Sequence, residues 1–204
     1  MTFDPSDLVR DYGNPIAEVL TCRRSAGLFD FSFVARGRVS GPQASAILAR
    51  ITPRRIDDLP PGRIRYAVRL DANGHLAADL TIWRQPDGSF EVMSGRRGDI
   101  SELVQEARPY GSDLSDVTAI FAVQGPRSLE VLGKAGFDHA LLSRLGYYTF
   151  CPASFDGISC LVGRLGYTGE AGFEIVAPRA MAGRLWTRLS AHVPPAGFAA
   201  IDTL

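Results

Sequence analysis

The sequence has little lysine and no excess of charge of either sign. Lys134 is the only lysine among 204 residues, so a lysine nucleophile or Schiff base has a single candidate, with no motif around it. The 22 basic and 22 acidic residues cancel, which argues against a surface that holds nucleic acid or an anionic membrane by bulk electrostatics. We therefore expect neither a nucleic acid nor a membrane as a partner.

Cysteine, histidine and long apolar runs are also scarce. The three cysteines form no Cys-x-x-Cys pair and the three histidines have no metal-ligand spacing, so we expect neither a disulfide framework nor a bound metal. No run approaches the ~18 apolar residues of a membrane span, and the N-terminus carries aspartates rather than an apolar signal region. These features favour a reduced, cytoplasmic setting.

A three-stranded pattern occupies the middle of the chain. Residues 64–70 alternate apolar and polar side chains, and extended runs follow at 76–83 and 90–93, each after a segment of turn-forming residues. This order predicts an antiparallel meander. On its first strand Arg63, Arg65 and Arg69 share one face, where they could meet an acidic partner.

Helical and extended patterns are mixed along the rest of the chain. Apolar residues at a spacing of three and four predict a helix from about 100 to 108, with Asp99 as its N-cap and Pro109 after its end. Strands predicted at 158–165 and 173–177 flank a glycine-rich loop. Because the visible strand connections resemble hairpins, we predict an α+β fold of antiparallel sheets with flanking helices.

The glycine-rich loop, Gly166 to Glu174, has three glycines at a spacing of three. A phosphate cradle would need a Gly-Lys-Ser/Thr sequence or a helix beginning at the loop, and neither is present. The spacing alone therefore favours a structural hairpin, with Glu170 and Glu174 as solvated charges.

The order of the motifs adds a resemblance that covers the chain from about residue 10 to 204. The chain resembles the aminomethyltransferase family, which includes the T-protein of the glycine cleavage system and its folate-dependent relatives. Its most specific piece is Gly-Tyr-Thr-Gly-Glu-x-Gly-Phe-Glu at 166–174. The segments that carry the resemblance, in order, are Leu28–Ser32, Val39–Pro42, Gly62–Tyr66, Gly74 with Asp79–Ile82, Val123–Pro126, Gly166–Glu174 and Gly197–Leu204.

The resemblance implies a tetrahydrofolate-binding fold of antiparallel α+β domains around a central folate channel. It implies a discontinuous folate-binding domain, 1–50 and 117–204, interrupted by a meander-plus-helix domain at 51–116. A third, β-rich domain normally follows in the family. The chain stops at Leu204, inside a motif that the family continues, so we expect either a short form or a fragment.

Three positions match the family's pterin site, and the catalytic position does not. Tyr66, Tyr167 and Glu174 are retained, with the carboxylate of Glu174 accepting hydrogen bonds from the pterin ring. The family's catalytic carboxylate falls at Ala78, beside Asp79. Adjacent strand residues point to opposite faces, so Asp79, the remaining catalytic candidate, would need a bulge to replace its neighbour.

Other departures from the family replace polar groups with apolar or smaller ones. Ile201 stands at an arginine position, Phe33 at a histidine position and Ser94 at an asparagine position near the folate. Two functions therefore stay open. The chain is either an enzyme that transfers a one-carbon unit from a donor, such as an aminomethylated lipoyl carrier protein, to tetrahydrofolate, or a non-catalytic subunit of a larger complex, similar to the small folate-fold subunit of heterotetrameric sarcosine oxidase.

Overall fold

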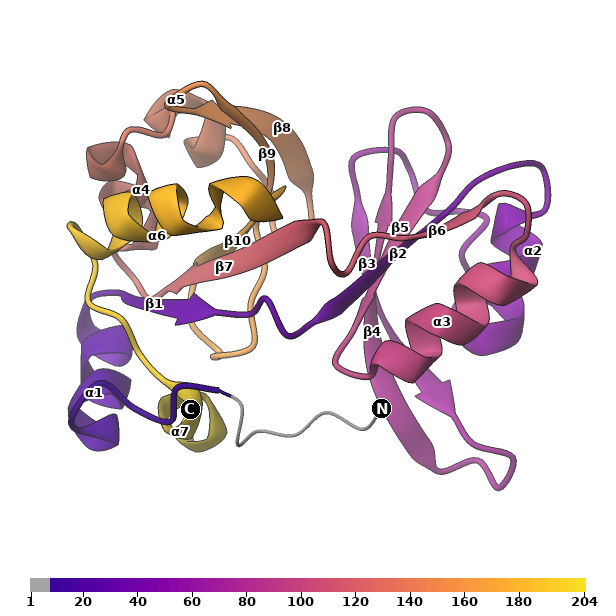
Figure 1. The fold of residues 1–204 in the computed structure, drawn as a ribbon, viewed down its shortest axis with the longest axis horizontal. Helices are drawn as coiled ribbons and strands as arrows, with labels where there is room; N and C mark the ends of the chain where they lie inside the picture. Colours follow the sequence, from indigo (N-terminus) through magenta and orange to yellow (C-terminus); the bar gives the residue numbers. More distant parts are fainter. Residues whose placement is uncertain (1–7) are drawn as a thin grey trace. The chain divides into compact units, whose positions relative to one another are not determined.

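The computed structural model describes residues 8–204, which form two compact units. We call residues 33–116 the inserted unit and residues 8–32 with 117–204 the discontinuous unit. Each unit contains a five-stranded antiparallel sheet with helices packed on it (Figure 1). The predicted α+β class, with antiparallel sheets and flanking helices, is confirmed.

The inserted unit holds the predicted meander. Its strands lie in the order β3-β4-β5-β2-β6, so the three meander strands are neighbours, as predicted. Its elements are β2 (Ala35–Val39), α2 (Ala44–Ile51), β3 (Ile64–Leu70), β4 (Leu76–Arg84), β5 (Phe90–Ser94), α3 (Arg97–Glu106) and β6 (Gly111–Asp113).

One face of this sheet packs against α2 and α3. Ile82 of β4 lies opposite Val92 of β5, and both join Leu48 of α2 and Ile100 of α3 in one core. Gly37 of β2 allows α3 to approach closely, because a Cβ there would lie 2.9 Å from a methyl carbon of Ile100. The opposite face of the sheet carries Tyr66, Thr81 and Met93 in one row.

Helix α3 begins earlier than predicted. It starts at Arg97, and Asp99 lies in its first turn rather than at the N-cap. The Asp99 carboxylate is buried, accepts a hydrogen bond from the Ser94 hydroxyl at 2.8 Å and pairs with Arg69. These tertiary contacts replace the local capping role that the sequence pattern suggested.

The discontinuous unit has the strand order β1-β7-β10-β9-β8, which places β7 and β10 inside the sheet. Its elements are α1 (Pro15–Arg24), β1 (Gly27–Asp30), β7 (Thr118–Gln124), α4 (Ser128–Ala135), α5 (His139–Ser143), β8 (Phe150–Phe155), β9 (Ile158–Gly163), β10 (Gly172–Pro178), the 3-10 turn η2 (Arg179–Met181), α6 (Ala182–Ser190) and α7 (Phe198–Thr203).

The core of this unit lies between its sheet and the helices α4 and α6. Phe173 and Ile175 of β10 face this core, where they meet Leu132 of α4 and Leu185 of α6. Side chains alternate along a strand, so Glu174 between them lies on the other face of the sheet. The predicted antiparallel pairing around the glycine-rich loop is present as the β9–β10 pair.

The division of the chain differs from the predicted domains at one boundary. The prediction assigned residues 1–50 to the discontinuous domain, whereas the observed units divide between 32 and 33. The reason is strand pairing, because β2 hydrogen-bonds to β5 and β6 and so brings residues 33–50 into the inserted unit. The second boundary lies between 116 and 117.

Two kinds of feature are absent from the part of the chain that the structure describes. No helix among residues 8–204 is long and apolar enough to cross a membrane. The same residues contain no group of three or more His, Cys, Asp or Glu side chains that could hold a metal ion.

Candidate functional site

Glu174 occupies the centre of the sheet in the discontinuous unit. It lies opposite Ala122 of β7 on one side and Gly163 of β9 on the other, and Ala122 is in turn opposite Phe29 of β1. These four residues form one row across the sheet, in which the neighbours of the carboxyl are small or apolar. Glu174 is only 4% exposed, so the interpretation of this residue as a solvated charge was wrong.

The carboxyl of Glu174 lacks a partner for one of its oxygens. Its Oε1 atom is buried and accepts no hydrogen bond from the described residues. Burial raises the pKa of Glu174 to about 8. A buried polar atom without a partner is rare in folded proteins, and it marks a place where a ligand can supply the missing hydrogen bond.

Gln124 explains two of the three glycines of the adjacent loop. Its side chain lies beside Gly172, where its Nε2 atom donates to the Leu165 carbonyl at 3.1 Å and its Oε1 atom accepts from the Thr168 hydroxyl at 3.0 Å. A Cβ at Gly166 or Gly172 would overlap this amide, at 1.8 and 2.3 Å. The loop is thus rich in glycine because it wraps a buried amide, a role that the sequence analysis missed.

Tyr167 lies at the outer side of this loop and is 49% exposed. Its ring meets the ring of Phe31 edge to face, with centroids 6.4 Å apart, and Phe31 in turn lies 6.1 Å from Phe29. Phe29 belongs to the sheet row of Glu174, so a chain of aromatic rings leads from that row to Tyr167. Such rings offer flat apolar surfaces to a planar ligand.

Arg23 of α1 supports the outside of the same loop. Its guanidinium donates to the Thr168 carbonyl at 2.8 Å and pairs with Glu170 at 2.9 Å. It also donates to the Leu204 carbonyl at 2.6 Å, just after α7, the helix that carries half-buried Ile201. Glu170 therefore has a structural partner, in contrast to Glu174.

The inserted unit carries the other two predicted site residues. Tyr66 lies opposite Thr81 and Asp79 lies opposite Val68, so Tyr66 and Asp79 share one face of the β3–β4 pair. Partial burial and, second, the Asp79 carboxylate raise the pKa of the Tyr66 phenol. Ala78 lies opposite Arg69 on the other face.

A bulge precedes this pair of residues on β4. The β3–β4 register shifts between Arg69 and Leu70, which pair with Ala78 and Leu76. The extra residue, Ala77, is unpaired in this register, and such a bulge changes which side chains a strand presents to each face. The register from Arg69–Ala78 to Tyr66–Thr81 is regular, so Asp79, rather than Ala78, shares a face with Tyr66 through this pairing and independently of the bulge.

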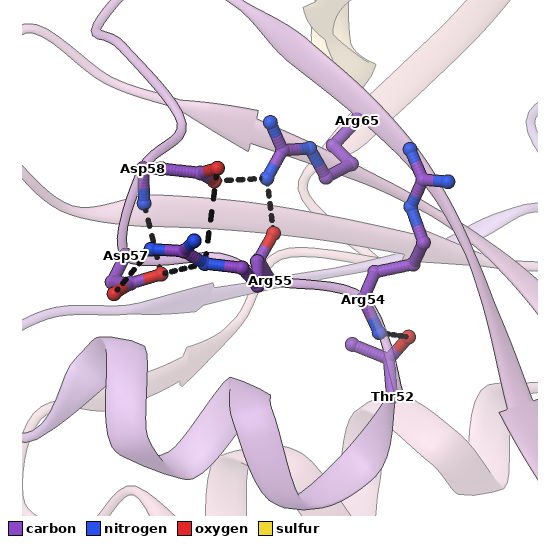
Figure 2. A network of polar contacts seen from close by, with 6 residues as sticks. All are labelled: Thr52, Arg54, Arg55, Asp57, Asp58 and Arg65. Atoms are coloured by element: carbon purple, nitrogen blue, oxygen red, sulfur yellow. Dashed lines mark hydrogen bonds and ion pairs between the residues drawn. The ribbon is translucent and has the colours of Figure 1, made fainter.

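Side chains on the opposite face of that sheet are engaged inside the inserted unit. Arg65 donates to Asp58 and to the Arg55 carbonyl, whereas Arg54 contributes its backbone N–H to Thr52 (Figure 2). Arg69 pairs with two carboxylates of α3, and the Ser94 hydroxyl also points to α3 through Asp99. Arg65 and Arg69 thus already have acidic partners within the inserted unit.

A separate hollow of about 550 Å³ lies beside α1 in the discontinuous unit. Its lining includes Tyr12, Glu18 and Pro195. Both oxygens of Glu18 are occupied, because they accept from the backbone N–H groups of Tyr12 at 2.6 Å and Gly197 at 2.8 Å. This carboxylate therefore joins two segments of the chain, which gives it a structural role.

Comparison of sequences places these features in a family. Residues 9–204 match the GCVT N-terminal domain. An aminomethyltransferase from Stenotrophomonas maltophilia is 36% identical over 97% of this chain and 56% of its own length. A probable aminomethyltransferase from Natronomonas pharaonis is 34% identical over 89% of this chain and 52% of its own length. The chain thus spans about half the length of the curated relatives it matches.

Comparison of structures agrees. The crystal structure of glycine cleavage system aminomethyltransferase T from Bartonella henselae matches with a TM-score of 0.84 at 29% identity, over 97% of this chain and 55% of that one. A chain of heterotetrameric sarcosine oxidase from Corynebacterium sp. U-96, in complex with pyrrole 2-carboxylate, matches with a TM-score of 0.60 at 18% identity, over 93% of this chain and 91% of that one, which shows a common fold. The chain belongs to the GCVT N-terminal domain family, together with the aminomethyltransferases.

Proposed function

We propose that this protein binds tetrahydrofolate and that Glu174 recognises its pterin ring. The observation that carries the proposal is the buried Oε1 atom of Glu174, which has no partner among the described residues. A pterin presents neighbouring N–H groups on one edge, and the Glu174 carboxylate, on releasing its proton as the ligand binds, would accept from both at once. The residues present therefore fit the group.

Tyr167 would contribute aromatic surface to the same ligand. Its ring is half exposed and stands at the end of the Phe29–Phe31 chain of rings, which keeps it in a defined place. On the family resemblance we also assign Tyr66, on the inserted unit, to ligand binding. Planar heterocycles bind well between apolar and aromatic side chains with a few polar groups for orientation.

We further propose that the chain acts in one-carbon transfer, with Asp79 as its proton-transfer group. When bound, tetrahydrofolate supplies a ring nitrogen that accepts the one-carbon unit. Asp79 is half-buried and shares a face with Tyr66, so its carboxylate would take up or return the proton of this exchange. General acid–base help of this kind contributes typically ~10² to 10⁴ in rate.

The donor and the setting complete the proposal. A relative of known structure is named as the aminomethyltransferase T of the glycine cleavage system, so we propose an aminomethyl donor, carried on a lipoyl protein, as the source of the one-carbon unit. We propose a cytoplasmic setting, in keeping with three cysteines that form no disulfide.

A calorimetric titration with tetrahydrofolate tests the binding. We expect Glu174→Ala to weaken the affinity by roughly 10- to 100-fold, because a charge-assisted hydrogen bond is lost. Glu174→Gln keeps the size and one acceptor, so its loss should be smaller. Glu130→Gln, at a half-buried glutamate on α4, is the matched control and should bind like the unaltered protein. Absence of binding to the unaltered protein would overturn the proposal.

A second candidate is a folate-binding subunit without catalysis, favoured by Ala78 at the family's carboxylate position. A transfer assay with several donors separates the two functions. Activity that is lost in Asp79→Asn supports the enzyme. Tight tetrahydrofolate binding without turnover, in both the unaltered protein and Ala78→Asp, supports the subunit.

A further inference from the structure

We propose that Gln124 is the positioning residue of this site, and that its buried amide sets the loop between β9 and β10 that carries Tyr167. The inference deepens the proposed function, and its ligand-binding part rests on it. The local sequence does not show this role, because Gln124 simply follows five apolar residues of β7, 119–123.

The environment of Gln124 is built around its amide. The residue is 0% exposed, at the end of β7, and its two strand neighbours are both glycine, Gly27 on β1 and Gly172 on β10. Gly166 of the loop also lies against the amide. A buried amide costs free energy unless it is hydrogen-bonded, and here both of its ends are bonded to the loop.

The two hydrogen bonds bracket Tyr167. The amide holds the Leu165 carbonyl before it and the Thr168 hydroxyl after it, so the intervening backbone has little freedom. A third tie follows at Ala171, whose carbonyl accepts from the Gly125 N–H at 2.7 Å, one residue after Gln124. The loop then enters β10 at Gly172, two residues before Glu174.

This arrangement links the positions of Tyr167 and Glu174. Gln124 and Glu174 lie on the same face of the sheet, in adjacent rows. Among the hydrogen bonds described, only those of the Gln124 amide hold the loop on both sides of Tyr167. If the amide is removed, Glu174 stays fixed in β10, while the loop loses the two hydrogen bonds that flank Tyr167. Truncation of a core residue that only fills space would not loosen the loop while leaving Glu174 in place.

Gln124→Met tests the proposal, because methionine keeps the length of the side chain and removes both hydrogen bonds. Val131→Ala, on the buried side of α4, is the control for a general loss of stability. We expect amide hydrogen exchange in the ligand-free protein to become faster at 164–172 in Gln124→Met and not in Val131→Ala. We expect tetrahydrofolate affinity to fall by about tenfold or more in Gln124→Met and to change by less than about twofold in Val131→Ala.

Thr168→Val is the second variant and removes only the hydroxyl donor, so it serves if Gln124→Met does not fold. It should speed exchange in the same segment, and its effect on affinity should be non-additive with that of Gln124→Met. Normal exchange at 164–172 in both variants overturns the inference, and so does faster exchange with unchanged affinity. If the unaltered protein binds no tetrahydrofolate, the proposed function fails, while the exchange data still decide whether Gln124 sets the loop.

Discussion

Two buried polar side chains on one face of the discontinuous sheet differ in how they are satisfied. Gln124 has partners for both ends of its amide, whereas one oxygen of Glu174 has none among the described residues. The first pattern is typical of a structural group and the second of a group that awaits a ligand. The contrast separates the residue that supports the site from the residue that recognises the ligand.

The protonation of Glu174 gives a prediction at this scale. Burial raises its pKa from 4.5 to about 8, so between these values the folded protein holds a proton that the unfolded chain has released. Its contribution to stability is therefore complete at or below pH 4.5 and is lost as the pH rises towards 8. Glu174→Gln has no such group, so it should become more stable relative to the unaltered protein by up to ~1.4 kcal/mol per pH unit in this window.

Urea unfolding of both proteins at pH 5.5, 6.5 and 7.5 measures this difference. The two proteins differ only at residue 174, so the contributions of all other residues cancel in the comparison. The sheet neighbours of Glu174, namely Phe29, Ala122 and Gly163, carry no titratable group. A constant stability difference across the three pH values would show that Glu174 is ionised in the folded protein.

Residue roles could be predicted from the sequence only where a motif carried them. Tyr167 and Glu174 were found through the Gly-Tyr-Thr-Gly-Glu segment, whereas spacing alone made Glu174 a solvated charge. Gln124 was missed, because its hydrogen bonds join residues more than 40 positions apart. The sequence signal was a glutamine at the end of an apolar strand, which becomes informative only when its partners are known.

At the scale of elements, local patterns were sufficient where hydrogen bonding is local. The meander strands were predicted because alternation and turn residues act within a few positions. The start of α3 was misplaced, because Asp99 is held by Ser94 and Arg69 instead of capping the helix. Residues 33–50 were assigned to the other domain, because the pairing of β2 with β5 spans more than 50 residues.

The turn between β7 and α4 gives a prediction at this scale. Gly125 has φ +135, and a Cβ there would lie 2.4 Å from the Ser25 carbonyl oxygen and 2.5 Å from that of Cys22. Gly13 has a similar φ of +129 with nothing within 4 Å, so it isolates the backbone strain from the contact. We expect Gly13→Ala to lower the free energy of unfolding by ~1–3 kcal/mol, and Gly125→Ala to lower it by clearly more.

Thermal and urea unfolding of the two alanine variants measure these losses of stability. Equal losses would show that backbone strain alone requires glycine at Gly125. A larger loss in Gly125→Ala would show that the end of α1 must touch the β7–α4 turn, which also positions Gln124. The contact matters for the site because Arg23, at the end of α1, holds the Thr168 carbonyl.

At the scale of the whole molecule, the described residues form two cores. One lies in the inserted unit, around Leu48, and the other in the discontinuous unit, around Leu132. Both leucines are 0% exposed, so each truncation to alanine should lower the free energy of unfolding by ~2–5 kcal/mol. Since each core closes on its own sheet, we expect the two units to open as separate cooperative regions.

Hydrogen exchange in the native protein distinguishes separate opening of the two units from unfolding of the whole chain at once. Leu48→Ala should speed exchange in β3, β4 and β5 and leave β7 and β10 protected, and Leu132→Ala should do the reverse. The same exchange measurement with tetrahydrofolate present gives a second test. If Glu174 and Tyr167 hold tetrahydrofolate, saturating ligand should restore protection to β7 and β10 in Leu132→Ala, because these two residues bind it only when the discontinuous unit is folded. Exchange that rises in both sheets in either variant would show that the chain unfolds as a single unit, and the ligand effect would then extend to all strands.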